Sequence, residues 1–303
     1  MTYRADLSTG QQSVWSGPAT PVDSGAVTTS QVWYASKDGT KVPLLIVARR
    51  GITPDGNRPV LLNGYGAYGY VGIPSFEPLA ASWVEAGGIY ALASIRGGGE
   101  LGEQWHRDGM LGKKQNSFDD LIAAAEWLVA NNYTRPERLA IRGSSAGGML
   151  VAVAAMQRPD LFGAVISINP HLDMLRYHRF LQAAPWVKEF GNPDVVEEFE
   201  YLRRYSPYHQ VREGVRYPAM LFMTGDNDTR VAPLHSRKMT ARLQAATRGD
   251  RPILLRYDLI AGHSTTGSAE LAVDQLTFLH AQLGLAPSGT FPGHSDPPPA
   301  SPR

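Results

Sequence analysis

Hydrophobic and polar positions along the chain follow two alternating periods. Short apolar runs, typical of buried strands, recur at 59–62, 88–95, 139–141, 164–168, 219–223 and 253–259. Segments with apolar residues at helical spacing lie between or after them, at 118–130, 149–156, 234–246 and 268–283. Ser117 is expected to cap the first of these helices, because its oxygen can accept the unpaired N–H groups of a first turn. Strands that alternate with helices predict an α/β fold, a mainly parallel sheet flanked by helices on both faces.

The two ends of the chain depart from this alternation. Residues 1–30 are polar and turn-rich and are expected to form an N-terminal extension with a turn at 7–10. Two β-rich runs around Asp38-Gly39 predict an antiparallel hairpin at one edge of the sheet. Residues 31–285 are therefore expected to form one α/β domain, and the proline-rich residues 286–303 a disordered tail.

Composition narrows the class of protein. The chain has 303 residues, 43% of them hydrophobic, which is enough for a sizeable core, and a net charge of +1 with mixed signs. This balance gives no electrostatic basis for nucleic acid or an anionic membrane as a partner. The absence of cysteine excludes disulfides, thiolate catalysis and cysteine-ligated zinc. With no signal-like N-terminus and no apolar run long enough to cross a bilayer, a cytoplasmic location is expected.

One stretch carries candidate chemistry on its own. Residues 143–147 read Gly-Ser-Ser-Ala-Gly, which fits the pattern G-x-S-x-G, and they stand between an apolar strand and a helical segment. This context predicts a sharp turn with Ser145 at its apex, near the unpaired N–H groups of the helix N-terminus. The glycines at 143 and 147 are expected because a side chain there would collide with the neighbouring strand or helix.

A serine needs a base to become a nucleophile, and the base needs an acid to orient it. Two later strands end in such groups: Asp226 and Asp228 follow 219–223, and His263 follows 253–259. The alternative is that the aspartates cap a turn and His263 is an ordinary loop histidine. The order Ser145, Asp, His263 is that of the α/β-hydrolases and favours a serine hydrolase without metal or organic cofactor. Spacing alone leaves both aspartates open as the acid, with loop capping preferred for Asp226.

Two further patterns match other kinds of site, but less well than the serine motif matches a hydrolase. Residues 64–69 match the dinucleotide-binding pattern G-x-G-x-x-G after a strand, but Pro74 and Pro78 interrupt the helix that should follow. His171, Asp173 and His178 could form a metal site, although scattered residues of these types on a connecting segment are usually solvated. Neither pattern changes the expectation of a hydrolase without a metal.

Eight motifs together resemble the catalytic domain of the prolyl oligopeptidase family of serine peptidases. They lie at 64–66, 96–106, 114–120, 143–148, 157–162, 205–208, 226–230 and 261–263, and the similarity extends from about residue 32 to residue 283. The resemblance implies an α/β-hydrolase fold with Asp228 as the acid. It also implies that the hydroxyl of Tyr65 and the backbone N–H of Ala146 stabilise the oxyanion.

The same resemblance implies a substrate pocket. Arg230 matches the family position that binds a substrate carbonyl, and Trp186 matches the indole that stacks on the substrate proline. Tyr68 and Phe190 are expected beside that indole. The implied substrate is a short peptide.

The sequence also departs from the family pattern. Family members carry a β-propeller before the hydrolase domain, whereas residues 1–16 resemble only the last strands of one. Ala146 replaces a frequent asparagine, and Thr229 replaces a second acidic residue. Without the propeller the site is expected to be open, so a carboxylesterase acting on aryl or feruloyl-type esters is the alternative function. A non-catalytic binding fragment is a more remote one, and the oligomeric state is not indicated.

Overall fold

The computed structural model describes residues 2–16, 23–263 and 268–285. Its main feature is an eight-stranded sheet in the order β10-β9-β8-β7-β5-β6-β4-β3. The strands are β3 (Val27–Ala35), β4 (Lys41–Arg49), β5 (Val60–Gly64), β6 (Ile89–Ala93), β7 (Leu139–Ser144), β8 (Ala164–Ile168), β9 (Ala219–Gly225) and β10 (Ile253–Asp258). Strands β5 to β10 run parallel, and β4 and β3 add the expected antiparallel hairpin at one edge. The predicted fold class is confirmed.

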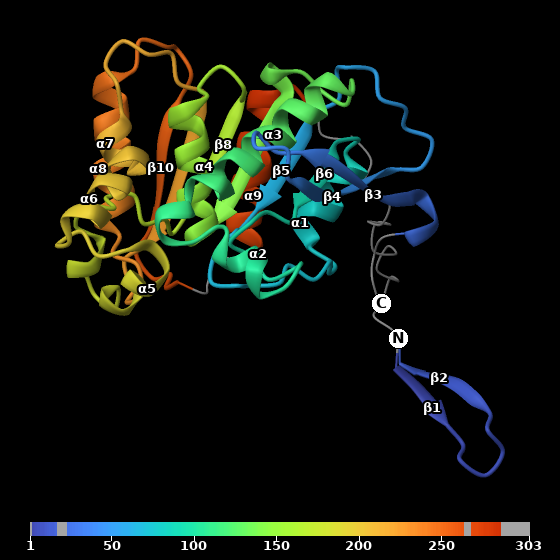
Figure 1. Cartoon of the computed structure of the whole chain (residues 1–303). Helices are drawn as coiled ribbons and strands as arrows, with labels where there is room; N and C mark the ends of the chain where they lie inside the picture. Colours follow the sequence, from blue (N-terminus) through green and yellow to red (C-terminus); the bar gives the residue numbers. More distant parts are fainter. Residues whose placement is uncertain (1, 17–22, 264–267, 286–303) are drawn as a thin grey trace, which may run out of the picture.

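Helices cover both faces of this sheet (Figure 1). They are α1 (Pro78–Glu85), α2 (Glu103–Arg107), α3 (Gln115–Ala130), α4 (Ala146–Gln157), α5 (Val187–Phe190), α6 (Val196–Tyr205), α7 (Pro207–Gln210), α8 (Leu234–Ala246) and α9 (Ala269–Leu283). Residues of α3, α4 and α8 share one hydrophobic core with the sheet, and residues of α1 and α9 share the other. Strand β5 contributes side chains to both cores. Val60 and Leu62 belong to the first core and Leu61 to the second, because successive side chains of a strand point to opposite faces.

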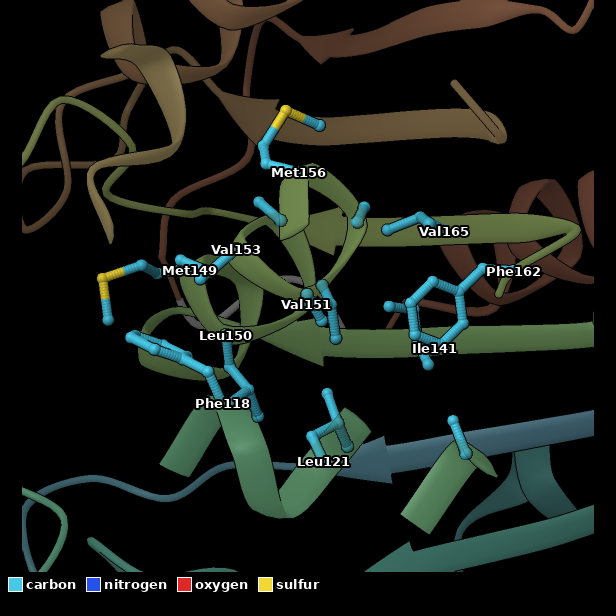
Figure 2. Packing of buried hydrophobic residues seen from close by; sticks show 14 of the residues in the cluster. Phe118, Leu121, Ile141, Met149, Leu150, Val151, Val153, Met156, Phe162 and Val165 are labelled. Atoms are coloured by element: carbon cyan, nitrogen blue, oxygen red, sulfur yellow. The ribbon is translucent and has the colours of Figure 1, made fainter. Parts of the chain in front are cut away.

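Helix α4 is buried along almost its whole length. Every residue from Ala146 to Met156 is buried, as expected for a helix that is apolar on all sides. Figure 2 shows Leu150 and Val151 of α4 among Phe118 and Leu121 of α3 and Ile141 of β7. Because this helix is fixed by packing on every side, the turn that leads into it is held in one place.

Two local expectations need correction. Ser117 does not cap α3, because the helix begins earlier, at Gln115, with Lys114 at the cap position. The Ser117 hydroxyl instead donates to the carbonyl of Arg96 at 2.7 Å. Helix α1 was not expected, and it begins at Pro78, where a proline fits the first turn. The connecting segment 171–212 holds the short helices α5, α6 and α7.

The N-terminal residues form a separate element. Strands β1 (Thr2–Ala5) and β2 (Gln12–Ser16) pair antiparallel in a two-stranded sheet of their own, with the predicted turn between them (Figure 1). Their side chains are exposed throughout. Strand β3 starts at Val27, so the larger sheet begins a few residues before the boundary expected at residue 31. The tail expected at 286–303 lies outside the described residues.

Candidate active site

The turn between β7 and α4 holds Ser145 in a strained conformation. Its φ and ψ are 57° and −118°, a combination that side-chain-bearing residues seldom adopt. The Ser145 N–H donates to the carbonyl of Ile168 at 2.8 Å, which ties the turn to the end of β8. A Cβ added to Gly143 would lie 2.1 Å from the carbonyl oxygen of Gly147, so only glycine fits there. The partly exposed serine is thus presented at the carboxyl edge of the sheet.

Asp228 and His263 meet at the ends of β9 and β10. The Nδ1 atom of His263 lies 2.8 Å from Oδ2 of Asp228. The other carboxylate oxygen accepts the backbone N–H groups of Arg230 at 2.9 Å and Val231 at 2.8 Å. Asp228 is only 2% exposed, so these three partners replace water around its charge and fix its orientation.

The two candidate acids, Asp226 and Asp228, have different partners in the structure. Asp226 is exposed, and its side chain accepts a hydrogen bond from the hydroxyl of Tyr257. Its backbone N–H donates to the carbonyl of Asp258 at 2.7 Å, joining the loop after β9 to the end of β10. Asp228 is therefore the aspartate that contacts His263, and Asp226 has the loop-capping position.

Asn169 is a residue that sequence reasoning missed. It follows β8, between the serine and histidine loops, with φ of 44°. Its backbone N–H donates to the carbonyl of Met223 at 2.8 Å, and its side-chain amide donates to the carbonyl of His263 at 3.1 Å. Because Ile168 holds Ser145 and Asn169 holds His263, the end of β8 supports both loops. The available signal was an asparagine, which tolerates positive φ, directly after a buried strand.

Tyr65 and Ala146, the two residues expected to stabilise the oxyanion, both lie beside Ser145. Tyr65 follows β5, the neighbour of β7, and its half-buried phenol lies close enough to the Ser145 side chain to interact with it. Burial raises the pKa of the Tyr65 phenol above its ordinary value, so the hydroxyl stays protonated and can donate. Ala146 is the first residue of α4, and an N–H at that position has no acceptor within its own helix. Two donors are thus available beside the Ser145 hydroxyl.

A buried lysine anchors the loop that carries Tyr65. The Nζ atom of Lys114 donates to the carbonyl of Gly66 at 2.6 Å and lies 3.4 Å from a carboxylate oxygen of Glu189. Glu189 is also 2.8 Å from Nε2 of His106. Burial lowers the pKa of Lys114 to about 8. Hydrophobic periodicity gives no signal for this contact, because Lys114 is far from Gly66 in sequence.

The residues expected to form a substrate pocket differ in exposure. Trp186 is half-buried, with its ring 5.6 Å from that of His171, and Arg230 is exposed. Tyr68 is 40% exposed and meets Phe190 edge-on at 5.5 Å. Phe190 itself is fully buried, so the expectation that it lines the pocket needs correction. It packs against Tyr68 as part of the core and offers no surface to a substrate.

A cavity of about 820 Å³ opens beside the nucleophile. Ser145, Tyr65 and Arg230 line one part of it. The segment 70–77 and α1 line another, together with the sheet face formed by β3 to β6. The candidate nucleophile therefore faces a space large enough for a sizeable organic group.

His171 and Asp173 are buried, contrary to the expectation that they are solvated. Asp173 pairs with Lys238 at 2.5 Å and Arg176 at 2.9 Å. His171 is 1% exposed, and neither of its ring nitrogens has a hydrogen-bond partner among the described residues. Burial lowers the pKa of His171 well below its usual range. Within residues 2–16, 23–263 and 268–285, no group of three or more such side chains is arranged to hold a metal ion.

The buried His171 predicts a stability that falls in acid. Unfolded histidine takes up a proton below about pH 6.5, whereas the folded side chain stays neutral, so the unfolded state gains protons and stability as pH falls. Between pH 7.5 and 5.0 this single group should lower the free energy of unfolding by about 2 kcal/mol. His171→Phe should reduce the drop by about that amount in urea denaturation at the two pH values. His178→Asn, which alters a histidine paired with Asp194, serves as the control, and equal drops in wild type and His171→Phe would contradict the assignment.

Known proteins with similar sequences and structures share one family. Residues 74–285 match the prolyl oligopeptidase family. The prolyl endopeptidase of Elizabethkingia meningoseptica is 40% identical over 288 residues, which cover 93% of this chain and 41% of that protein. The prolyl oligopeptidase ophP of Omphalotus olearius is 43% identical over 265 residues, which cover 85% of this chain and 36% of that protein.

Solved structures agree with these sequence matches. One, from a structural and mechanistic analysis of two prolyl endopeptidases, superposes with a TM-score of 0.90 and 45% identity, covering 94% of this chain and 42% of that one. Prolyl oligopeptidase B of Galerina marginata, bound to a 35-residue hydrolysis and macrocyclization substrate, gives 0.89 and 37%, with coverage of 94% and 42%. The chain thus spans about two fifths of the length of these relatives. Among the described residues, no helix is both long and apolar enough to cross a membrane.

Proposed function

Since the chain belongs to the prolyl oligopeptidase family, we propose that it is a serine peptidase that cleaves peptides after proline, with Ser145 as nucleophile. The contact between Asp228 and His263, at the same sheet edge as Ser145, is the observation that carries the proposal. Asp228 holds Nδ1 of the imidazole, so Nε2 is the ring nitrogen that would act as the base. Labelling with a fluorophosphonate tests this directly. An assembled triad reacts, and a non-catalytic binding fragment does not.

In the proposed reaction, His263 takes the proton from the Ser145 hydroxyl as its oxygen attacks the substrate carbonyl. The negative charge that develops on the carbonyl oxygen is stabilised by the Tyr65 hydroxyl and the Ala146 N–H. His263 then gives the proton to the leaving amine, and an acyl-enzyme forms on Ser145. In the second half, His263 takes a proton from water as the water oxygen attacks the acyl carbon, and it then returns the proton to the Ser145 oxygen as the carboxylic acid product leaves. These steps need no metal or organic cofactor.

The substrate class is proposed from the relatives and from the exposed aromatic surface. The relatives bear the names prolyl endopeptidase and prolyl oligopeptidase, and one was solved with a peptide substrate. Trp186 provides a half-exposed flat ring on which a proline could stack. The large cavity beside Ser145 also favours a second activity on aryl esters, whose better leaving groups tolerate looser positioning than amides. A cytoplasmic location, and the absence of nucleic acid or membranes as partners, stay predictions.

Trp186 and Arg230 should affect the two substrate classes differently. Trp186→Ala removes a stacking surface worth about 0.5–1.5 kcal/mol, so kcat/KM should fall several-fold on both prolyl peptides and aryl esters. Arg230→Ala removes a charged donor to a peptide carbonyl, worth about 1.5–3 kcal/mol, so kcat/KM should fall roughly 10- to 100-fold on peptides. Small esters lack that carbonyl and should be nearly unaffected.

The measurement compares kcat/KM on a Z-Gly-Pro anilide with that on p-nitrophenyl and feruloyl esters, for wild type and both variants. Arg237→Ala is a suitable control, because this arginine packs over the ring of Tyr257 and does not line the cavity beside Ser145. Equal losses on peptides and esters from Arg230→Ala would refute the carbonyl-binding role. A wild-type enzyme with no ester cleavage would point to a strict peptidase.

A further inference from the structure

The cavity beside Ser145 has a wall that the catalytic steps do not use. This wall is the segment 70–77, which carries Tyr70, Ile73 and Phe76 along the cavity. These three side chains are 59%, 75% and 51% exposed, respectively. Large apolar side chains gathered around a cavity that contains the nucleophile are a typical feature of a ligand site.

The wall is held in place although it has no regular secondary structure. Gly72 donates its N–H to a carboxylate oxygen of Glu100 at 3.0 Å. The carbonyl of Tyr70 accepts the N–H of Gly99 at 3.1 Å. A Cβ added to Gly99 would lie 2.3 Å from the carbonyl oxygen of Gly69. A glycine at position 99 is therefore required for the turn at 96–99 to approach the segment that begins at Gly69. The apolar side chains are thus displayed on a fixed support.

Arg142 and Glu77, which both line the cavity, compensate each other's charge. Arg142 lies 3.0 Å from Glu77 and donates to the side-chain oxygen of Gln275 at 2.7 Å. The hydroxyl of Tyr90 donates to Glu77 at 3.3 Å. Arg142, Glu77 and Tyr90 already have partners, so these three groups do not call for an ionic ligand. The part of the cavity that can select an apolar side chain is the wall formed by 70–77.

We propose that this cavity is a second substrate subsite, which takes a bulky apolar side chain from a residue adjacent to the proline held at Trp186. The inference rests on the proposed function, because it needs a peptide whose carbonyl is attacked by Ser145. Arg230 lines the same cavity as Ile73 and Phe76, so a peptide held through its carbonyl at Arg230 would have a neighbouring side chain within this cavity. The preferred substrate therefore has leucine or phenylalanine next to proline rather than glycine.

The test uses two peptide series in which proline is constant and its neighbour is glycine, alanine, leucine or phenylalanine. In one series the neighbour precedes proline, and in the other it follows the cleaved bond. In at least one series, wild type should cleave the leucine peptide with a kcat/KM about 10-fold or more above that of the glycine peptide. The series that shows this preference identifies the side of the bond that enters the cavity.

The variant Ile73→Ala/Phe76→Ala should bring the leucine-to-glycine ratio close to one. Val273→Ala is the matched control: Val273 is 59% exposed, lies on α9 and does not line the cavity, so this variant should keep the wild-type ratio. A ratio near one in both series for wild type, or a ratio retained in the double variant, would overturn the inference.

A binding measurement separates this inference from the proposed function. Calorimetric titration of the Ser145→Ala variant with the same peptides needs no turnover. If wild type neither cleaves the peptides nor reacts with a fluorophosphonate, the proposed function fails. Tighter binding of leucine than glycine peptides that depends on Ile73 and Phe76 would still support the subsite, and equal binding would reject it.

Discussion

Ser145→Ala, His263→Ala and Asp228→Asn are each expected to lower kcat by on the order of 10⁴-fold or more while the protein stays folded. The loss is large in each case because each of the three residues has a role that the others cannot take over. Ser145 forms the covalent bond, His263 moves the proton, and Asp228 holds Nδ1 of the imidazole at 2.8 Å. Steady-state kinetics on a prolyl anilide, together with circular dichroism and thermal unfolding, measure both halves of the prediction. Double variants should add little, because the three groups act as one unit.

Asp226→Asn is the matched control for the acid. It makes the same chemical change two residues away, at an exposed carboxylate that contacts Tyr257 rather than His263. Its effect on kcat should be small beside that of Asp228→Asn. If Asp226→Asn were equally damaging, the assignment of Asp228 as the acid would be wrong.

Tyr65→Phe is expected to lower kcat by about 10²- to 10³-fold with little change in KM. The phenol donates a hydrogen bond that strengthens as charge develops on the carbonyl oxygen, so its loss affects the transition state more than the bound substrate. The ring itself is retained, together with its edge contact with Tyr70 at 5.2 Å. The packing of the loop should therefore be unchanged.

Kinetics on the same anilide, with kcat and KM separated under saturating conditions, measure this effect. Tyr133→Phe is the control, because it removes a hydroxyl from a ring that pairs with Trp127 elsewhere in the molecule. If Tyr65→Phe changed only KM, and only slightly, Tyr65 would have a packing role and would not stabilise the oxyanion.

The sheet and its principal helices could be predicted because their signals are local. Strand β8 and helix α8 occupy the predicted ranges, 164–168 and 234–246, and β9 extends its predicted range only beyond residue 223. The candidate triad could be predicted from the sequence for a related reason. Each of its residues follows a buried strand, and the carboxyl ends of parallel strands meet at one edge. Knowing the type of each element was therefore enough to bring Ser145, His263 and both aspartates to the same edge, whereas the choice of Asp228 over Asp226 came from the family resemblance.

What could not be predicted depends on contacts between distant segments. Phe190 is aromatic and adjacent in sequence to the pocket segment, yet its burial is decided by Tyr68 and His171 from other loops. Helix α1 lacked a local signal because Pro74 and Pro78 interrupt the pattern, although Pro78 is compatible with a first turn. Asn169 acts through its amide on the backbone of His263, which no periodicity records.

The anchoring of the Tyr65 loop by Lys114 also limits how this part of the molecule can be exchanged between proteins. The loop sequence alone does not specify its position, since Gly66 is held by an ammonium from the start of α3 and that ammonium is neutralised by Glu189 of α5. Glu189 in turn contacts His106 of α2. A chimera that received only 64–70 would gain the phenol without its support. The smallest transferable unit therefore includes at least these four separate stretches of chain, which would have to be inherited together.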